Sequence, residues 1–190
     1  MRQMVLDRSM KLETRYGGDL LRGKRKTARP ISTKYAMHTT LRSDEAKGQL
    51  SLLLPKNARF IRHLVGSLAT QYGVRVYELS VNSNHIHLLT RAMSREGFKS
   101  FLRVLAGMIA MKLTGAKKGN SLLKRFWASR PWSRIVSGWG RAFAIARNYV
   151  LQNQLEADGI IAYTLRNGLQ SRGGLSVKRL RTIRCGLAGS

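Results

Sequence analysis

The chain has 190 residues, which suits one compact domain with appendages, and 43% of them are hydrophobic, enough for a packed core. Its 35 Lys and Arg residues against 9 Asp and Glu residues give a net charge of +26, so a polyanion such as nucleic acid is the expected partner. The single cysteine, Cys185, excludes an internal disulfide and a thiolate-based zinc finger.

No stretch of the chain approaches the roughly 18 consecutive apolar residues of a membrane-spanning helix. The amino-terminal residues also lack the apolar core of a secretory signal. We therefore expect a cytoplasmic protein with no membrane partner.

Residues 1–34 are polar, basic and interrupted by glycine and proline, and we predict a flexible basic arm over this range. A cluster of cations within it is typical of a phosphate-binding segment, although a solvated leader has the same composition. The cluster consists of Arg22, Lys24, Arg25 and Lys26.

The first predicted strand covers 35–42, YAMHTTLR, which contains β-branched and aromatic residues. This strand carries His38, which we expect on a solvated face. A short apolar run at 49–54 is either an edge strand or the start of a helix. A helix is predicted from Pro55 to Gly73, since apolar residues recur there at every third or fourth position.

Residues 74–90, VRVYELSVNSNHIHLLT, predict two short strands joined by turn-forming residues at 82–84. Because side chains alternate between the two faces of a strand, His85 and His87 point the same way. Two adjacent imidazoles can bind a divalent cation, but histidines on the solvated face of a basic protein give the same pattern.

A second helix is predicted from an N-cap at Ser94 to a stop at Gly115. The basic loop that follows, GAKKGN, either grips phosphate or is a plain connector. Its two cations are Lys117 and Lys118.

Residues 122–127 and 132–136 predict strands or a hairpin around Pro131. Three tryptophans alternate with arginines in this region, and aromatic faces among cations are surfaces on which unpaired bases stack. Because a tryptophan in a strand is more often a core residue, we expect at most one of them to stack on a base. The residues concerned are Trp127, Trp132, Trp139, Arg125, Arg130 and Arg134.

The spacing of apolar residues over 140–158 predicts a last helix, ended by Gly159. Tyr149 and Asn153 are four positions apart, so their side chains lie on the same helical surface. Residues 166–190 contain no acidic residue, and they predict a basic tail that is disordered or ordered only on nucleic acid.

Three strings carry a resemblance to a known family: SNHIHLL, FWASRPWSRIV and ARNYVLQN, in this order. Together, on a basic chain with the predicted βαββα order, they resemble the HUH single-tyrosine transposases, most closely the REP-associated tyrosine transposases of bacteria. The similarity extends over about 35–159. The expected fold is therefore α+β, with a ferredoxin-like or RRM-like βαββαβ core. In it an antiparallel sheet has helices on one face, followed by a C-terminal helix that bears the tyrosine, all within a domain at 35–165.

The resemblance implies roles for four residues. His85 and His87 bind a divalent ion, Mg²⁺ or Mn²⁺, Tyr149 attacks DNA, and Asn153 completes the metal site. A shift in register would exchange Asn153 for its neighbours Gln152 or Gln154. Attack by a tyrosine leaves a 5′-phosphotyrosine and a free 3′-OH, and a second 3′-OH can reverse the step, so no ATP is needed.

The implied activity is that of a metal-dependent single-stranded DNA endonuclease and strand transferase, a transposase located at the bacterial nucleoid. The implied substrate carries a hairpin, either REP-like or an element-end palindrome, and a homodimer remains open. Nearby arginines, Arg147 being one candidate, can favour the ionised phenol. The cations expected to contact DNA are Arg22, Lys24, Arg25, Lys26, Lys117, Lys118, Arg125, Arg130, Arg134 and Arg147.

Two alternatives remain at this stage. A non-catalytic nucleic-acid-binding module of the same architecture would show neither metal dependence nor a covalent adduct. A zinc hydrolase also uses a His-x-His pair, but it requires a third acidic or histidine ligand nearby, and residues 88–90 offer none.

Overall fold

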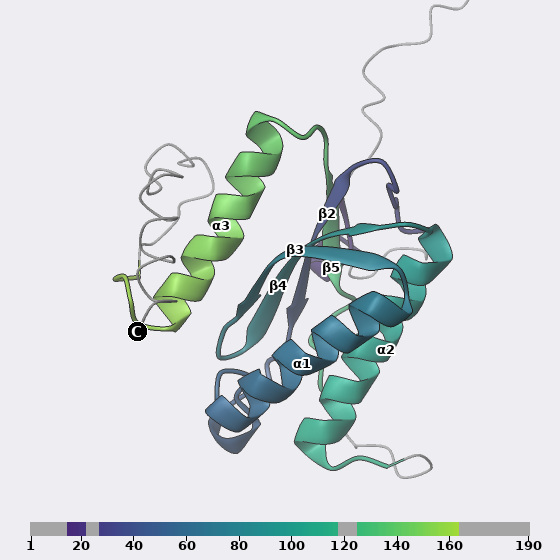
Figure 1. The fold of residues 1–190 in the computed structure, drawn as a ribbon. Coiled ribbons are helices and arrows are strands. Elements are labelled where there is room, and N and C mark those ends of the chain that lie inside the picture. The colour runs from purple at the N-terminus through teal and green to yellow at the C-terminus, as the bar shows by residue number, and fades with distance from the viewer. Residues whose placement is uncertain (1–14, 22–26, 118–124, 164–190) are drawn as a thin grey trace, which may run out of the picture.

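In the computed structural model, residues 15–21, 27–117 and 125–163 are described, and in these ranges the chain forms a five-stranded antiparallel sheet covered by three α-helices (Figure 1). The strands are β1 (Arg15–Tyr16), β2 (Ala36–Arg42), β3 (Val74–Val81), β4 (His85–Ala92) and β5 (Trp132–Val136). The helices are α1 (Pro55–Gln71), α2 (Arg95–Thr114) and α3 (Arg141–Ala157), with short 3₁₀ turns at Gly18–Leu21 and Gly48–Leu50.

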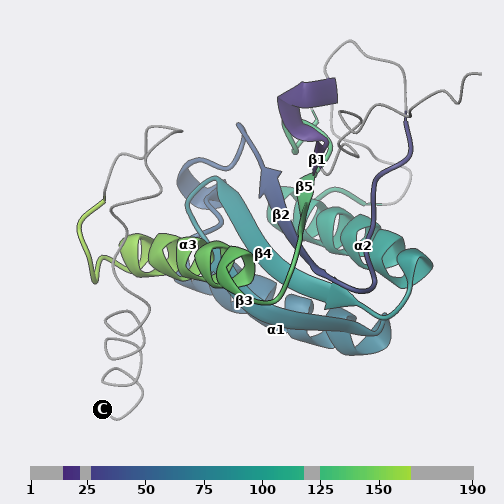
Figure 2. The ribbon, with the colours of Figure 1, turned by 90° about the horizontal axis from the view of Figure 1, so that it is seen from above.

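The strand order across the sheet is β1-β5-β2-β4-β3. From β2 to β5 the chain runs βαββαβ, which is the predicted ferredoxin-like order. Helices α1 and α2 cover one face of the sheet, and α3 lies against the other face (Figure 2). The predicted α+β architecture, with a C-terminal helix added to the core, is confirmed.

The ends of α2 follow from local chemistry that the sequence displays. Ser94 Oγ accepts a hydrogen bond from the amide of Gly97, which satisfies one of the donors exposed at a helix start. Gly115 closes the helix with φ of 72°, a backbone conformation that favours glycine. Helix α1 likewise begins at Pro55, where a missing N–H costs nothing.

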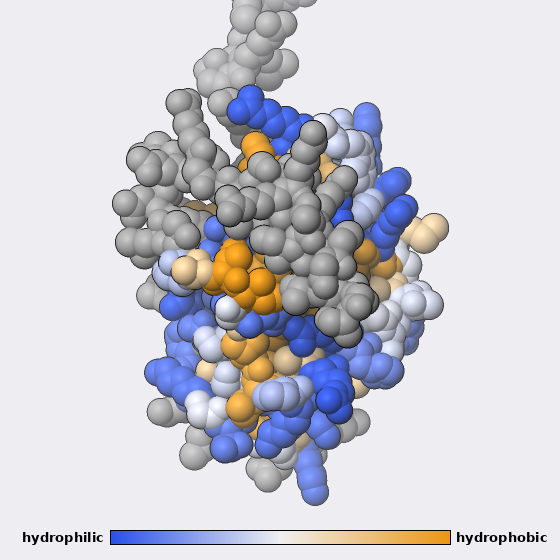
Figure 3. All heavy atoms as spheres, turned by 60° about the vertical axis from the view of Figure 1, so that its left-hand side comes forward, coloured by the Kyte–Doolittle hydropathy of each residue, from blue (hydrophilic) through white to orange (hydrophobic). Residues whose placement is uncertain are grey.

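The two faces of the sheet have cores of different size. Most buried apolar side chains lie between the sheet and α1 and α2. The cluster beneath α3 is small, and apolar side chains on this side are bordered by hydrophilic ones (Figure 3). Its fully or nearly buried members are Ala36, Leu89, Val136, Ala146 and Val150.

Two predicted segments have a different local structure. The run at 49–54 follows a 3₁₀ turn and leads into α1, so it is the start of a helix and not an edge strand. Residues 125–127 are not a strand, because Phe126 and Trp127 are consecutive and both pack against the same core, which strand alternation prevents. The remainder of that predicted strand, 122–124, lies outside the described residues.

The sheet is wider than predicted. Arg15 and Tyr16, from the segment expected to be a basic arm, pair with Arg134 and Ser133 of β5. The domain boundaries at 34 and 165 stay a prediction, as does the tail at 166–190, which lies outside the described residues. Within the part of the chain that the structure describes, no helix is both long and apolar enough to cross a bilayer.

Candidate active site

The site is built on two rows of side chains that run across β5, β2 and β4. In one row, Thr40 lies opposite both Trp132 and His87. In the next row, His38 lies opposite both Arg134 and Leu89. Because residues opposite one another in a sheet share a face, these side chains all point toward α3.

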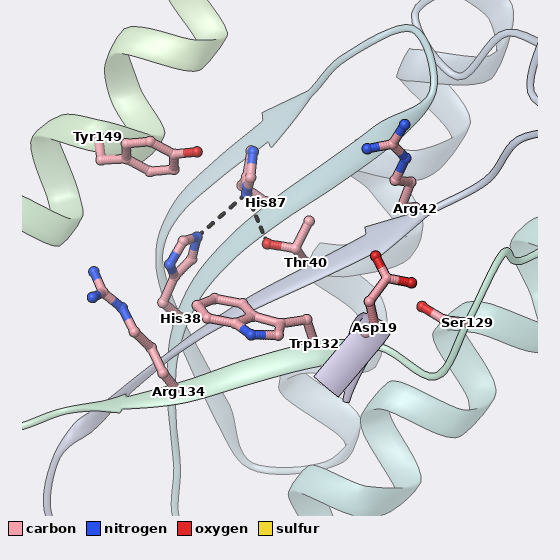
Figure 4. Close-up of a pocket in the computed structure, with 10 residues that line it drawn as sticks. Asp19, His38, Thr40, Arg42, His87, Ser129, Trp132, Arg134 and Tyr149 are labelled. Atoms are coloured by element: carbon pink, nitrogen blue, oxygen red, sulfur yellow. Dashed lines mark hydrogen bonds between the residues drawn. The ribbon is translucent and has the colours of Figure 1, made fainter. Parts of the chain in front are cut away.

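The two histidines of the His-x-His string lie side by side on β4. The ring centroids of His85 and His87 are 4.8 Å apart. His85 Nδ1 lies 2.7 Å from Asn84 Oδ1. His87 Nδ1 lies 3.0 Å from Thr40 Oγ1 and 3.3 Å from His38 Nε2 (Figure 4). Each ring is therefore held through the same nitrogen.

His38 was expected on a solvated face, and this prediction is wrong. The side chain is 4% exposed, since β2 is flanked by β4 and β5 and its ring packs edge-on against Trp132 and Tyr149. Burial lowers the pKa of His38 to about 3, and the charge of Arg134 acts in the same direction. His38 is therefore neutral at neutral pH.

Tyr149 projects from α3 to this cluster. Its ring centroid lies 5.4 Å from that of His87 and 5.6 Å from that of His38. In Figure 4 its hydroxyl points toward His87. A phenol from late in the chain is thus placed beside an imidazole from the middle of the chain.

A cavity of about 430 Å³ opens beside these side chains. It is lined by residues from β2, β4, β5 and α3, from the 3₁₀ turn that follows β1, and from the segment before β5. These residues are Gly18, Asp19, His38, Thr40, Arg42, His87, Ser129, Trp132, Arg134 and Tyr149. Its size is that of a small-ligand site.

Asn153 lies one turn beyond Tyr149 and is 7% exposed. Its Nδ2 donates to the backbone oxygen of Tyr149 at 2.6 Å, and Asn153 is not among the residues lining the cavity. The neighbouring carboxamides are engaged elsewhere: Gln152 donates to Glu156, and Gln154 Oε1 accepts from the amide of Val81. Of the three, Asn153 is the one bonded to the tyrosine's own backbone.

The arginine beside the phenol is Arg134. Burial lowers the pKa of Arg134 and the charge of Arg15 adds to this effect, whereas Tyr149 opposes it. Arg147, the candidate chosen from the sequence, instead donates from Nε to Glu78 Oε1 at 2.8 Å. Glu78 is a buried carboxylate on β3, so this pair fastens α3 to the sheet.

The other predicted DNA-contacting cations are dispersed. Lys117, Arg125 and Arg130 are exposed, and none of them lines the cavity. The remaining five lie outside the described residues: Arg22, Lys24, Arg25, Lys26 and Lys118.

The three tryptophans have different environments. Trp127 donates from its ring nitrogen to Ala106 and packs on the larger core. Trp132 lines the cavity, edge-on to His38. Trp139 is 43% exposed. The Trp139 ring also packs against Tyr77 and Phe143. Trp127 is therefore a core residue, and base stacking by one of the other two stays a prediction.

Sequence reasoning missed several cavity residues. Thr40 is two positions after His38, so strand alternation alone would have placed both on one face. Gly18, Asp19 and Ser129 gave no such signal, because they reach the cavity only through pairing of distant segments.

The donor set allows a narrow choice of metal chemistry. Among the described residues, no three His, Cys, Asp or Glu side chains are grouped so that they could hold a metal ion. An ion here would rest on His85, His87 and a neutral oxygen, for which the Asn153 carboxamide is the candidate. Such a set of three ligands leaves coordination positions open, unlike the closed four-ligand set of a structural zinc site, and the identity of the ion, Mg²⁺ or Mn²⁺, stays a prediction.

The chain was compared with known proteins. The model of the family described as "Transposase IS200 like" matches residues 32–153, which extend from before β2 into α3. A solved REP-associated tyrosine transposase, bound to a REP hairpin, is similar with a TM-score of 0.53 and 16% identity over 70% of this chain and 73% of that one. A Deinococcus radiodurans R1 protein described as a transposase gives a TM-score of 0.39 and 18% identity over 68% of this chain and 98% of that one. No curated protein matches the chain.

Proposed function

Because the chain belongs to the IS200-like transposase family, we propose that it cuts and rejoins single-stranded DNA in a metal-dependent reaction with Tyr149 as the nucleophile. The observation that supports this most directly is the 5.4 Å between the ring centroids of Tyr149 and His87. These residues come from α3 and β4, and both line one cavity next to an arginine. A passive binding protein would not need this arrangement.

The covalent step balances without another reactant. The Tyr149 oxygen forms a bond to the phosphorus of a DNA phosphodiester, and the bond from phosphorus to the 3′ oxygen breaks. The phenol loses its proton to solvent, and the leaving 3′ oxygen takes one up. A 3′-OH from another strand reverses the step at the phosphotyrosine, which transfers the strand.

Arg134 has the position to assist this attack. An arginine side chain stays protonated at neutral pH, so it places a positive charge near the phenol and near any phosphate that binds in the cavity. This charge stabilises the negative charge that develops at phosphorus.

His85 and His87 would hold the metal ion, with Asn153 as the candidate third ligand. When bound, the ion would neutralise charge on the scissile phosphate and orient it. The ligand atom of Asn153 would be its carboxamide oxygen, because an amide nitrogen has no lone pair for a metal, and the nitrogen donates to the backbone oxygen of Tyr149.

We extend to this chain the kind of DNA seen with the similar REP-associated transposase, a hairpin, here with a single-stranded flank. The flank would enter the cavity, because a base-paired helix is too wide for it. The exposed cations would contact the backbone, so affinity should fall steeply with salt, with a log-log slope of roughly −0.7 per contacted phosphate.

The test is incubation with hairpin-bearing single-stranded oligonucleotides, with and without Mg²⁺ or Mn²⁺, followed by a denaturing gel. We expect an adduct that survives denaturation with wild-type protein and metal, and none with Tyr149→Phe, while DNA binding is retained. The matched control is Tyr77→Phe, on the same side of the sheet, which should form the adduct normally. Absence of an adduct from every sample would favour the non-catalytic binding module, and an adduct with Tyr149→Phe would mean another nucleophile.

A further inference from the structure

His87 is held on one edge of its ring by two partners from β2. Thr40 Oγ1 and His38 Nε2 both approach Nδ1, at 3.0 and 3.3 Å. The other nitrogen, Nε2, takes part in neither contact and points away from both partners, into the space beside the Tyr149 hydroxyl (Figure 4).

The location of one proton decides whether this ring can bind an ion. A neutral imidazole has one N–H, and only the other nitrogen has a lone pair for a metal. For Nε2 of His87 to be a ligand, the proton must be on Nδ1. That N–H would then donate to Thr40 and His38.

The neighbouring histidine indicates the same tautomer by a simpler route. His85 Nδ1 lies 2.7 Å from the carboxamide oxygen of Asn84, which can only accept a hydrogen bond. The His85 proton is therefore on Nδ1, and its Nε2 carries the lone pair. With the same protonation, both rings would have Nε2 as the nitrogen available to a metal.

His38 itself does not have the position of a ligand. Its Nε2 faces His87, its ring is enclosed by Trp132 and Tyr149, and its Nδ1 is buried with no hydrogen-bond partner among the described residues. A buried polar atom without a partner is costly. If His38 Nε2 accepts the hydrogen bond from His87 Nδ1, the neutral His38 ring carries its own proton on Nδ1, so the tautomer proposed for His87 leaves this buried N–H without a partner among the described residues.

We propose that Thr40 and His38 are positioning residues that hold His87 as its Nδ1–H tautomer and thereby aim the Nε2 lone pair at the metal position. The proposal rests on the function proposed above and deepens it. Metal-bound histidines commonly donate their second N–H to such a partner, whose loss weakens metal binding by about 10-fold to 100-fold.

The experiment measures the tautomer and the metal affinity separately in the full chain. Ring ¹⁵N–¹H correlation spectra of the metal-free protein should show His87 protonated on Nδ1. Titration with Mn²⁺ should give an affinity about tenfold weaker for Thr40→Val, and up to about 100-fold weaker when His38→Phe is added. His38→Gln restores an oxygen acceptor, so it should bind Mn²⁺ better than His38→Phe.

Thr39→Val is the matched control, because it makes the same change one residue away. Thr39 is opposite Leu88 and faces the larger core, and its buried hydroxyl has no partner among the described residues. Its removal should leave the His87 tautomer and the Mn²⁺ affinity unchanged.

Two results would overturn the proposal: a wild-type His87 protonated on Nε2, or a folded double variant that binds Mn²⁺ as tightly as wild type. Because the tautomer is measured in the metal-free protein, that measurement tests the proposal even if the protein binds no ion. A wild-type protein with the Nδ1–H tautomer that binds no Mn²⁺ would instead overturn the metal dependence in the proposed function.

Discussion

The two faces of the sheet perform different tasks, although the same strands build both. On the α1 and α2 side, Ile86 and Leu88 of β4 enter a large apolar core. On the α3 side, the alternate residues of β4 are His85, His87 and Leu89, and only Leu89 joins a core, a small one. Alternation along one strand therefore separates the residues that stabilise the fold from those available for chemistry.

This division has a cost on the α3 side. That face carries polar groups that a dry core would exclude, among them His38, Glu78 and Arg134. Helix α3 is held there partly by polar contacts, since Arg147 binds Glu78 and Gln154 binds the end of β3. The helix that bears Tyr149 thus depends on hydrogen bonds more than α1 and α2 do.

The largest expected effect is on activity. His87→Ala should abolish metal-dependent adduct formation, because it removes one of the two imidazoles at the metal position. The change in stability should be smaller than for a core residue, since the cavity beside His87 admits water. Adduct yield and urea unfolding measure the two quantities, and undiminished adduct formation would contradict the metal assignment.

Leu88→Ala changes the adjacent residue, on the opposite face, and should have the opposite signature. Leu88 is 0% exposed in the larger core, so the truncation should lower the free energy of unfolding by about 2–5 kcal/mol. Adduct yield per folded molecule, measured well below the unfolding midpoint, should stay near that of wild type. A loss of activity in the folded fraction would show that the faces are not independent.

Local sequence patterns predicted those features that depend only on the geometry of a single strand or helix. Strand alternation placed His85 and His87 on one face, and the spacing of Tyr149 and Asn153 placed both on one helical surface. The position of His38 could not be predicted in this way, because it depends on the register of β2 against β4. That register is set by pairing between segments far apart in the chain.

The choice of arginine illustrates both situations. Arg147 is two positions before Tyr149, and residues so spaced on a helix do not face each other, so the sequence already argued against contact. Arg134 could be placed beside Tyr149 only once β5 was known to pair with β2. Arg134 lies close to α3 because of the order of the strands in the sheet, and no local sequence pattern predicts that order.

The ion pair beneath α3 should show an asymmetry. Arg147→Leu leaves the Glu78 carboxylate, with a side chain 3% exposed, without its guanidinium and should destabilise the protein by about 3 kcal/mol. Glu78→Gln should cost less, because the Arg147 side chain is 35% exposed and can turn to water. Urea unfolding of both variants and of Arg147→Leu with Glu78→Leu measures this. If both single variants lowered the free energy of unfolding equally, the unpaired buried carboxylate would not be the main source of the destabilisation.

The smallest effect at neutral pH concerns His38. Because its folded pKa is about 3, below the ordinary 6.5, the unfolded chain binds a proton there that the folded chain does not. The free energy of unfolding should therefore fall as pH falls from 6.5 toward 3, and this contribution is absent above 6.5. His38→Phe removes it, so the variant should gain stability relative to metal-free wild type on acidification. The control is His63→Phe, which changes an exposed histidine on α1 and keeps the His38 contribution, so its stability should fall on acidification as that of wild type does. If the stability of His38→Phe instead varied with pH in parallel with that of wild type, His38 would not be buried as a neutral ring.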